Sequence, residues 1–156
     1  MTDTQGGGMV ANKSIAQPWE CDVMGHMTTR FYISKFDDAS YHVLHDVFGW
    51  TISGNEAGRY GWADVRHVIE YKAEVSAGDI LEIRARVRKI GGKSFTTLYE
   101  MINLSRDELA ATLESICVYF DLEARQAIPI TDEMRAGAQP FMEQADSSAS
   151  DNAGQV

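Results

Sequence analysis

Cysteine is scarce in this sequence, with only Cys21 and Cys117 among 156 residues. Two widely separated cysteines provide neither a disulfide framework nor a CxxC metal motif, so we expect reduced thiols and a cytoplasmic protein. No second histidine lies at metal-ligand spacing from His26, and His42 and His45 are expected on the outer face of a helix. The sequence therefore predicts no metal site.

Basic residues and long apolar runs are few as well. The chain has 14 Lys and Arg against 23 Asp and Glu, for a formal net charge of -9. Nucleic-acid binding needs clustered positive charge, so this balance argues against a nucleic-acid partner. No stretch approaches the ~20 apolar residues that span a bilayer, and residues 1–12 lack the basic flank and apolar centre of a signal peptide. We therefore expect no membrane partner.

The remaining composition is that of one globular domain. Hydrophobic residues make up 44% of the chain, and its length fits a single folded unit. Residues 1–13 are polar and Gly-rich, and residues 139–156 are rich in Ser, Ala and Asp, so both segments have little to bury. We expect a disordered N-terminus, a folded domain over 14–138 and a flexible C-terminal tail.

The first half of the domain is predicted to contain one long helix. A short strand is expected over 14–19, followed by a loop and then a helix over 30–48 that ends at Gly49. Apolar residues recur in this helix at steps of three and four, which indicates a wide buried face. Lys35 is expected with other polar residues on the opposite, exposed face.

A period of two then replaces the helical period, which is typical of strands. Strands are expected over 63–75, 80–90, 93–104 and 109–121, with a short helix after Pro129. Thr131 or Asp132 is expected to cap this helix. One long helix covered by one large antiparallel sheet is an α+β arrangement, here a first strand followed by a four-stranded meander.

The loop before the long helix contains a candidate catalytic group. Asp22 lies just upstream of the predicted helix N-terminus. The unpaired amides and the dipole at such an end stabilise a negatively charged oxygen. A carboxylate at this position suits acyl transfer, because it attacks a carbonyl or activates water while the amides hold the oxyanion.

Four segments of the chain carry recognisable motifs. Residues 22–32 (DVMGHMTTRFY) resemble the signature D-x-x-G-[HIV]-V-x-x-x-x-Y, and 33–40 (ISKFDDAS) follow it in the predicted helix. Residues 90–95 (IGGKSF) form the predicted hairpin, and 125–130 (RQAIPI) follow the last strand. In this order the four segments resemble the 4-hydroxybenzoyl-CoA thioesterase-like family of hotdog-fold acyl-CoA thioesterases. The resemblance implies a hotdog fold, in which a five-stranded antiparallel sheet wraps a long central helix.

The resemblance also implies roles for residues of the loop. It places the catalytic carboxylate on Asp22 and assigns oxyanion binding and substrate positioning to Gly25, His26, Thr29 and Arg30. Two positions depart from the family pattern: a Thr28-Thr29 pair replaces the asparagine pair of many relatives, and His26 replaces the aliphatic residue of the hydroxybenzoyl enzymes.

The family further implies an assembly and a substrate. Hotdog domains pair their sheets edge to edge, so we expect a homodimer or a homotetramer. Each site would then take Asp22 from one subunit and part of its pocket from the neighbour. The implied substrate is an acyl-CoA, and CoA belongs to this substrate, so no separate cofactor is expected.

A basic run near the predicted hairpin is the candidate CoA site. Arg88, Lys89 and Lys93, with the adjacent Ser94, stand out in an acidic protein. CoA carries three phosphates, which Arg and Lys bind well. The alternative is a solvated strand face on which these cations pair with Glu side chains across the sheet.

Other interpretations of the site residues remain open. Asp22 also fits a simple turn residue. His26 fits a packed histidine that bonds backbone in the loop. Asp37, near the edge of the apolar stripe, is a second candidate catalytic carboxylate, although a paired structural carboxylate is the alternative. The acyl pocket has aromatic candidates that fit the core equally well: Trp19, Trp50, Tyr60, Trp62 and Phe95.

The sequence therefore predicts an acyl-CoA thioesterase that releases a free acid and CoA. One alternative is a hotdog dehydratase or hydratase, in which Asp22 and His26 supply the carboxylate–histidine pair of that chemistry. The other is a noncatalytic acyl-CoA binding module. The acyl group itself stays open at this stage.

Overall fold

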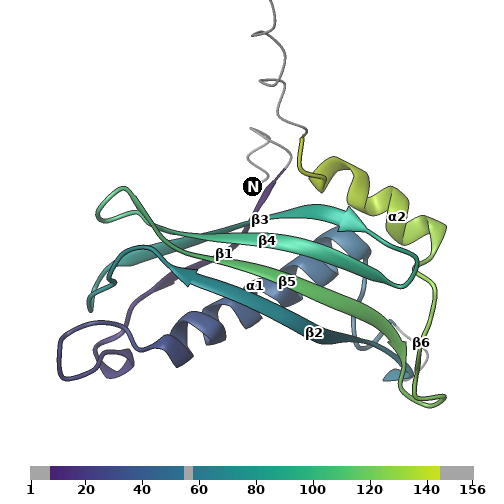
Figure 1. The fold of residues 1–156 in the computed structure, drawn as a ribbon, viewed down its shortest axis with the longest axis horizontal. Helices are drawn as coiled ribbons and strands as arrows, with labels where there is room; N and C mark the ends of the chain where they lie inside the picture. The colour runs from purple at the N-terminus through teal and green to yellow at the C-terminus, as the bar shows by residue number, and fades with distance from the viewer. Residues whose placement is uncertain (1–7, 55–57, 145–156) are drawn as a thin grey trace, which may run out of the picture.

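The computed structural model describes residues 8–54 and 58–144. A long helix, α1 (Thr29–Phe48), lies along the concave face of one antiparallel sheet that curves around it (Figure 1). The strands are β1 (Met9–Ile15), β2 (Tyr60–Tyr71), β3 (Ile80–Ile90), β4 (Ser94–Asn103), β5 (Glu108–Asp121) and β6 (Gln126–Ala127). The expected α+β class, with a sheet wrapped around one long helix, is confirmed.

Three short helices complete the described chain. A single 3-10 turn, η1 (Pro18–Glu20), precedes α1. After β6, α2 (Asp132–Ala138) packs against α1 and is followed by the 3-10 turn η3 (Gln139–Phe141). Thr131 caps α2 as predicted, because its side chain accepts the N–H of Met134. None of the helices in residues 8–54 and 58–144 is long and apolar enough to cross a membrane.

The apolar stripe of α1 forms the centre of the core. Phe36 and Val43 are each 1% exposed, and Val47 is 2% exposed. The helix ends where the sequence predicts, because Gly49 adopts a φ of 63°, a left-handed conformation that favours glycine. The Gly49 N–H donates to the carbonyl of His45 and so closes the last turn.

Lys35 departs from the expected polar face of α1. It is only 6% exposed, and its ammonium lies 3.1 Å from the Glu20 carboxylate. Its Nζ also donates to the carbonyl oxygen of Ile15 at 3.3 Å. The expectation of an exposed Lys35 is therefore wrong, because the chain that precedes the helix folds back over this side chain.

The strand order is β1-β3-β4-β5-β2, with β6 paired to β5. β3, β4 and β5 form a meander as expected, but β2 pairs with β5 rather than with its sequence neighbour β3. The predicted four-stranded meander is therefore wrong for β2. Alternation of apolar residues identifies each strand, but it does not identify the neighbour with which the strand pairs.

The ordered chain extends beyond the expected boundary at its N-terminal end. Residues 9–13 were expected to be disordered, yet they belong to β1, because Met9 and Ala11 bury their side chains at 5% and 3% exposure. At the C-terminal end, Phe141 and Met142 of the expected tail pack against the core. The expected segments 1–7 and 145–156 lie outside the described residues.

β2 lies at the end of the strand order and carries apolar residues on its surface. Val65 is 61% exposed, Val68 is 39% exposed and Tyr71 is 46% exposed. A terminal strand presents backbone groups that a further strand can pair with. This edge is therefore a candidate surface for association between subunits.

Candidate active site

Asp22 organises a tight turn between η1 and α1. Its carboxylate Oδ1 accepts the backbone N–H of Met24 at 2.8 Å and that of His26 at 3.4 Å. Gly25 has a φ of 83°, which only glycine adopts without strain in such a turn. The turn role considered for Asp22 is thus present. The other carboxylate oxygen, Oδ2, accepts no hydrogen bond from the described residues.

The turn is held at both ends by backbone hydrogen bonds. The Thr28 N–H donates to the carbonyl of Glu20 at 3.0 Å, and the Met27 N–H donates to the carbonyl of Val75 at 2.7 Å. These bonds place Asp22 between the start of α1 and the segment that precedes β3. The position of the carboxylate is therefore set by three separate parts of the chain.

Two amides at the start of α1 are available for a negatively charged oxygen. Thr29 and Arg30 are the first two helical residues, and their N–H groups have no acceptor within the helix. Both residues are exposed. Thr28 differs, because its N–H is already bound to Glu20 and its buried hydroxyl has no hydrogen-bond partner in the described chain.

His26 is engaged away from Asp22. Its Nε2 lies 3.0 Å from a carboxylate oxygen of Glu74, and its side chain is 34% exposed. Only its backbone N–H contacts the Asp22 carboxylate. The side chains of Asp22 and His26 therefore do not form the carboxylate–histidine pair that a dehydratase requires.

Asp37 lies on α1, away from the Asp22 loop and facing β2. Partial loss of water around its carboxylate raises the pKa of Asp37 above the ordinary value, and the negative charge of Asp64 raises this pKa further. His67 opposes the shift. The structure therefore groups Asp37 with Asp64 and His67 instead of with Asp22.

Replacing Asp37 by asparagine is expected to stabilise the protein slightly at neutral pH. A raised folded-state pKa means that the ionised carboxylate costs stability, and solvent screening limits this cost to about 0.3 kcal/mol. The cost is absent below the unfolded-state pKa of about 3.9 and develops as the pH rises through the higher folded-state pKa. Urea unfolding of both proteins at pH 3 and pH 7 measures the difference. A less stable Asp37→Asn protein at pH 7 would contradict this account.

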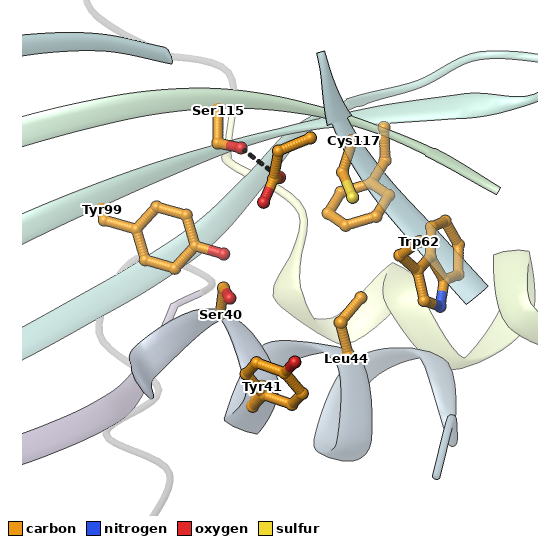
Figure 2. A pocket seen from close by; sticks show the side chains of 9 residues that line it. Ser40, Tyr41, Leu44, Trp62, Tyr99, Ser115 and Cys117 are labelled. Carbon is orange, nitrogen blue, oxygen red and sulfur yellow. Dashed lines mark hydrogen bonds between the residues drawn. The ribbon is translucent and has the colours of Figure 1, made fainter. Parts of the chain in front are cut away.

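A cavity of about 70 Å³ lies between the middle of α1 and the sheet (Figure 2). Two of the aromatic residues considered for an acyl pocket, Trp62 and Phe95, line it, whereas Trp19, Trp50 and Tyr60 do not. The full lining is Ser40, Tyr41, Leu44, Trp62, Asp64, Phe95, Tyr99, Ser115 and Cys117.

The cavity and the Asp22 loop are far apart within one chain. Thr29, at the start of α1, precedes Ser40 by 11 residues, which corresponds to roughly 17 Å along a helix. A short acyl group therefore does not reach from the Asp22 turn to the cavity of the same subunit.

The residues considered for CoA binding lie at the opposite end of β3 from the Asp22 turn (Figure 1). The length of β3 corresponds to roughly 33 Å between its ends. Arg88 pairs with Glu114 at 2.8 Å and with Glu143 at 3.2 Å, as the alternative of a paired strand face predicts. Lys89 and Lys93 are exposed, and Ser94 begins β4. Within one subunit, these candidate CoA-binding residues therefore do not lie near Asp22.

Asp64 and Ser115 were not among the residues singled out from the sequence. Ser115 occupies an inward-facing position of β5 between Leu113 and Cys117, all three of which are buried. A small polar residue on an otherwise apolar strand face is the signal that indicates a cavity there. Asp64 had no such signal, because a bulge next to it in β2 shifts the register against β5. No group of three or more metal-ligating side chains occurs in the described part of the chain.

The chain is similar to known proteins in both sequence and fold. A family model described as the thioesterase-like superfamily matches residues 16–137. A probable thioesterase from Escherichia coli is 17% identical with a TM-score of 0.72, over 85% of this chain and 98% of that chain. A 1,4-dihydroxy-2-naphthoyl-CoA thioesterase from Synechocystis is 16% identical with a TM-score of 0.72, over 85% and 96%. A Staphylococcus aureus protein in complex with CoA is 15% identical with a TM-score of 0.77, over 97% and 96%.

No curated protein sequence matches the chain. At these identities the likeness to the solved structures shows the fold, and it confirms the hotdog arrangement of one long helix wrapped by an antiparallel sheet. The family match indicates the class of reaction, thioester hydrolysis, and it covers the Asp22 turn, α1 and the strands β2 to β6. The chain therefore belongs to the thioesterase-like superfamily, which makes it a thioester hydrolase.

Proposed function

We propose that the protein hydrolyses an acyl-CoA thioester to the free acid and CoA, with Asp22 as the catalytic carboxylate. The observation that carries the proposal is the position of this carboxylate, with Oδ2 available, directly before the amides of Thr29 and Arg30. In this arrangement the amides stabilise the oxyanion that forms at the thioester carbonyl. The CoA-bound Staphylococcus aureus structure, which shares the fold, supports an acyl-CoA as the ligand.

Two routes are open to the carboxylate. As a nucleophile, Asp22 attacks the carbonyl carbon, expels the CoA thiolate and leaves a mixed anhydride that water then hydrolyses. As a general base, Asp22 takes a proton from the water that attacks the carbonyl carbon. Both routes yield one carboxylic acid and one CoA thiol. Neither requires the His26 ring, which is bound to Glu74.

The site is proposed to be completed by a second copy of the chain. One subunit keeps the Asp22 turn and the cavity roughly 17 Å apart along α1. The exposed apolar residues of the terminal strand β2 support a homodimer formed at this edge, with the Asp22 turn of one subunit serving the cavity of its partner. The expected homotetramer would join two such dimers. Cys21 and Cys117 are free thiols, which supports the proposed cytoplasmic location.

Placing negative charge on the β2 edge is expected to separate the subunits. The double variant Val65→Glu/Val68→Glu should raise the dimer dissociation constant at least tenfold, about 1.4 kcal/mol, because like charges would face each other across the edge. Analytical ultracentrifugation over a concentration series measures this constant. Leu104→Glu, at an exposed position in the β4–β5 turn, is the matched control and should leave the assembly unchanged. A dimer that withstands the double change would place the interface elsewhere.

Release of free thiol from a panel of acyl-CoAs tests the proposed function. The panel includes short, branched, aromatic and zwitterionic acyl groups, because the sequence leaves the acyl group open. Hydrolysis of at least one member at a rate above the spontaneous rate is expected. Binding without turnover of any member would instead establish the noncatalytic binding module.

A further inference from the structure

The cavity between α1 and the sheet has aromatic walls and a polar end. The hydroxyl of Tyr99, a residue that is only 2% exposed, points into it (Figure 2). At the same end, Ser115 Oγ donates to Asp64 Oδ1 at 3.2 Å, the bond drawn as a dashed line in Figure 2. The Cys117 thiol also interacts with the Asp64 carboxylate. An ionised carboxylate has about four acceptor positions, so Asp64 keeps the capacity to accept a further hydrogen bond from a ligand.

The walls hold the shape of this space. Trp62 packs edge-on against Phe95, with 5.0 Å between the ring centroids, and its ring lies tilted against that of Tyr119 at 4.7 Å. Aromatic faces attract cations as well as apolar groups. Tyr41, from α1, contributes a further ring to the lining.

The charge around the cavity is acidic. None of its nine lining residues is Lys or Arg. Asp64 lines it, and Asp37 interacts with Asp64 from α1. The facing cation is His67, whose Nε2 lies 3.6 Å from Asp64 Oδ1 and which is charged only when protonated. A donor or a cation is therefore favoured in this space, whereas an acyl group that ends in a carboxylate is repelled.

The volume limits what enters. A water molecule needs about 10–15 Å³ of such space, so the cavity has room for about five non-hydrogen atoms. This size fits the end of an acyl group and not a long aliphatic chain.

We propose that this cavity selects acyl groups whose far end carries a hydrogen-bond donor, either a hydroxyl or a protonated amine, with Asp64 as the acceptor. The proposal deepens the proposed thioesterase function and rests on it. Asp64 would act in substrate specificity and not in the chemical step. It receives the far end of the acyl group while Asp22 of the second copy in the proposed dimer acts on the thioester.

The test compares kcat/KM for three acyl-CoAs of equal chain length: hexanoyl-CoA, 6-hydroxyhexanoyl-CoA and 6-aminohexanoyl-CoA. The wild-type protein should favour at least one donor-bearing substrate over hexanoyl-CoA by about tenfold or more, the effect of one hydrogen bond to a charged group. Asp64→Leu should remove this preference, so that the ratio of kcat/KM between the donor-bearing substrate and hexanoyl-CoA falls to about one.

Asp64→Asn separates the two donors. An asparagine oxygen still accepts from a hydroxyl but no longer attracts an ammonium group. If the preferred group is the amine, Asp64→Asn should lower its kcat/KM about 10- to 100-fold. If the preferred group is the hydroxyl, the loss should stay within about threefold. Asp107→Asn, in the exposed β4–β5 turn, is the matched control and should change neither preference.

Two results would overturn the proposal. One is a wild-type preference for hexanoyl-CoA over both donor-bearing substrates. The other is an equal loss on all three substrates in Asp64→Leu, which would indicate a structural role. If no substrate releases thiol, the proposed function fails instead. Calorimetric titration of the intact acyl-CoAs into wild type and Asp64→Leu then tests acyl-group binding in the cavity without turnover. Equal dissociation constants of the two proteins for the donor-bearing acyl-CoAs would refute the proposed role of Asp64.

Discussion

Replacing Asp22 by alanine is expected to lower kcat for acyl-CoA hydrolysis by about 10²- to 10⁴-fold, the usual contribution of a positioned acid–base group. The loss should appear in kcat with little change in KM, because the carboxylate acts on the carbonyl or the water and not on the CoA portion. Thiol release under saturating substrate measures it. The size of the effect makes this substitution the most direct test of the proposed active site.

The structural role of Asp22 requires a second variant. The carboxylate Oδ1 accepts the N–H groups of Met24 and His26, so alanine removes turn bonds together with the reactive group. Asp22→Asn keeps an acceptor for these bonds but is neither a base nor a carboxylate nucleophile. Both variants should be equally slow. An Asp22→Asn protein with wild-type kcat would limit Asp22 to the turn, and Asp37 would become the carboxylate to test.

Replacing Lys35 by methionine is expected to destabilise the protein by about 3–5 kcal/mol, the usual effect of breaking a buried ion pair. The side chains of Lys35 and Glu20 are 8% and 13% exposed, and methionine would leave the carboxylate with little water and no cation. The carbonyl of Ile15 would lose its donor as well. Urea unfolding at pH 7 measures the change in the free energy of unfolding.

A double variant separates the ion pair from simple packing. Adding Glu20→Gln to Lys35→Met removes the stranded charge, while the glutamine oxygen still accepts from the Gln17 N–H, as Glu20 does at 2.9 Å. The double variant should recover about half of the lost stability or more. A loss below about 1 kcal/mol in Lys35→Met alone would match an exposed pair. It would show that η1 opens away from α1 in solution.

The secondary structure of this protein could be predicted from local sequence because its signals are local. The period of the apolar residues located α1, and a glycine in the left-handed conformation ended it at Gly49. Strict alternation identified β3 with its observed bounds, Ile80–Ile90, and its inward residues Leu81 and Ile83 are at most 1% exposed. The motif that begins at Asp22 likewise lies in one continuous segment, and the family match includes it.

The features that local signals did not predict all depend on contacts between distant segments. Lys35 has an ordinary surface position by helical period, and only the return of η1 over α1 buries it. The cavity needs α1, β2, β4 and β5 together, so neither Asp64 nor Ser115 stood out with the Asp22 loop. In the linear sequence, the basic residues near Lys93 resembled a CoA site. In the folded sheet they lie at the far end of β3 from Asp22.

The α+β class, the long helix, the strands that follow it and the thioesterase motif could be predicted from residues close along the chain. The strand expected over 14–19 was misplaced, because β1 spans Met9–Ile15. The pairing of β2 with β5, the burial of Lys35 and the position of Asp64 at an aromatic cavity follow from the tertiary structure. Strand pairing and burial depend on which distant surfaces meet when the sheet closes around α1. That choice is made by the packing of the whole domain and not by any one segment.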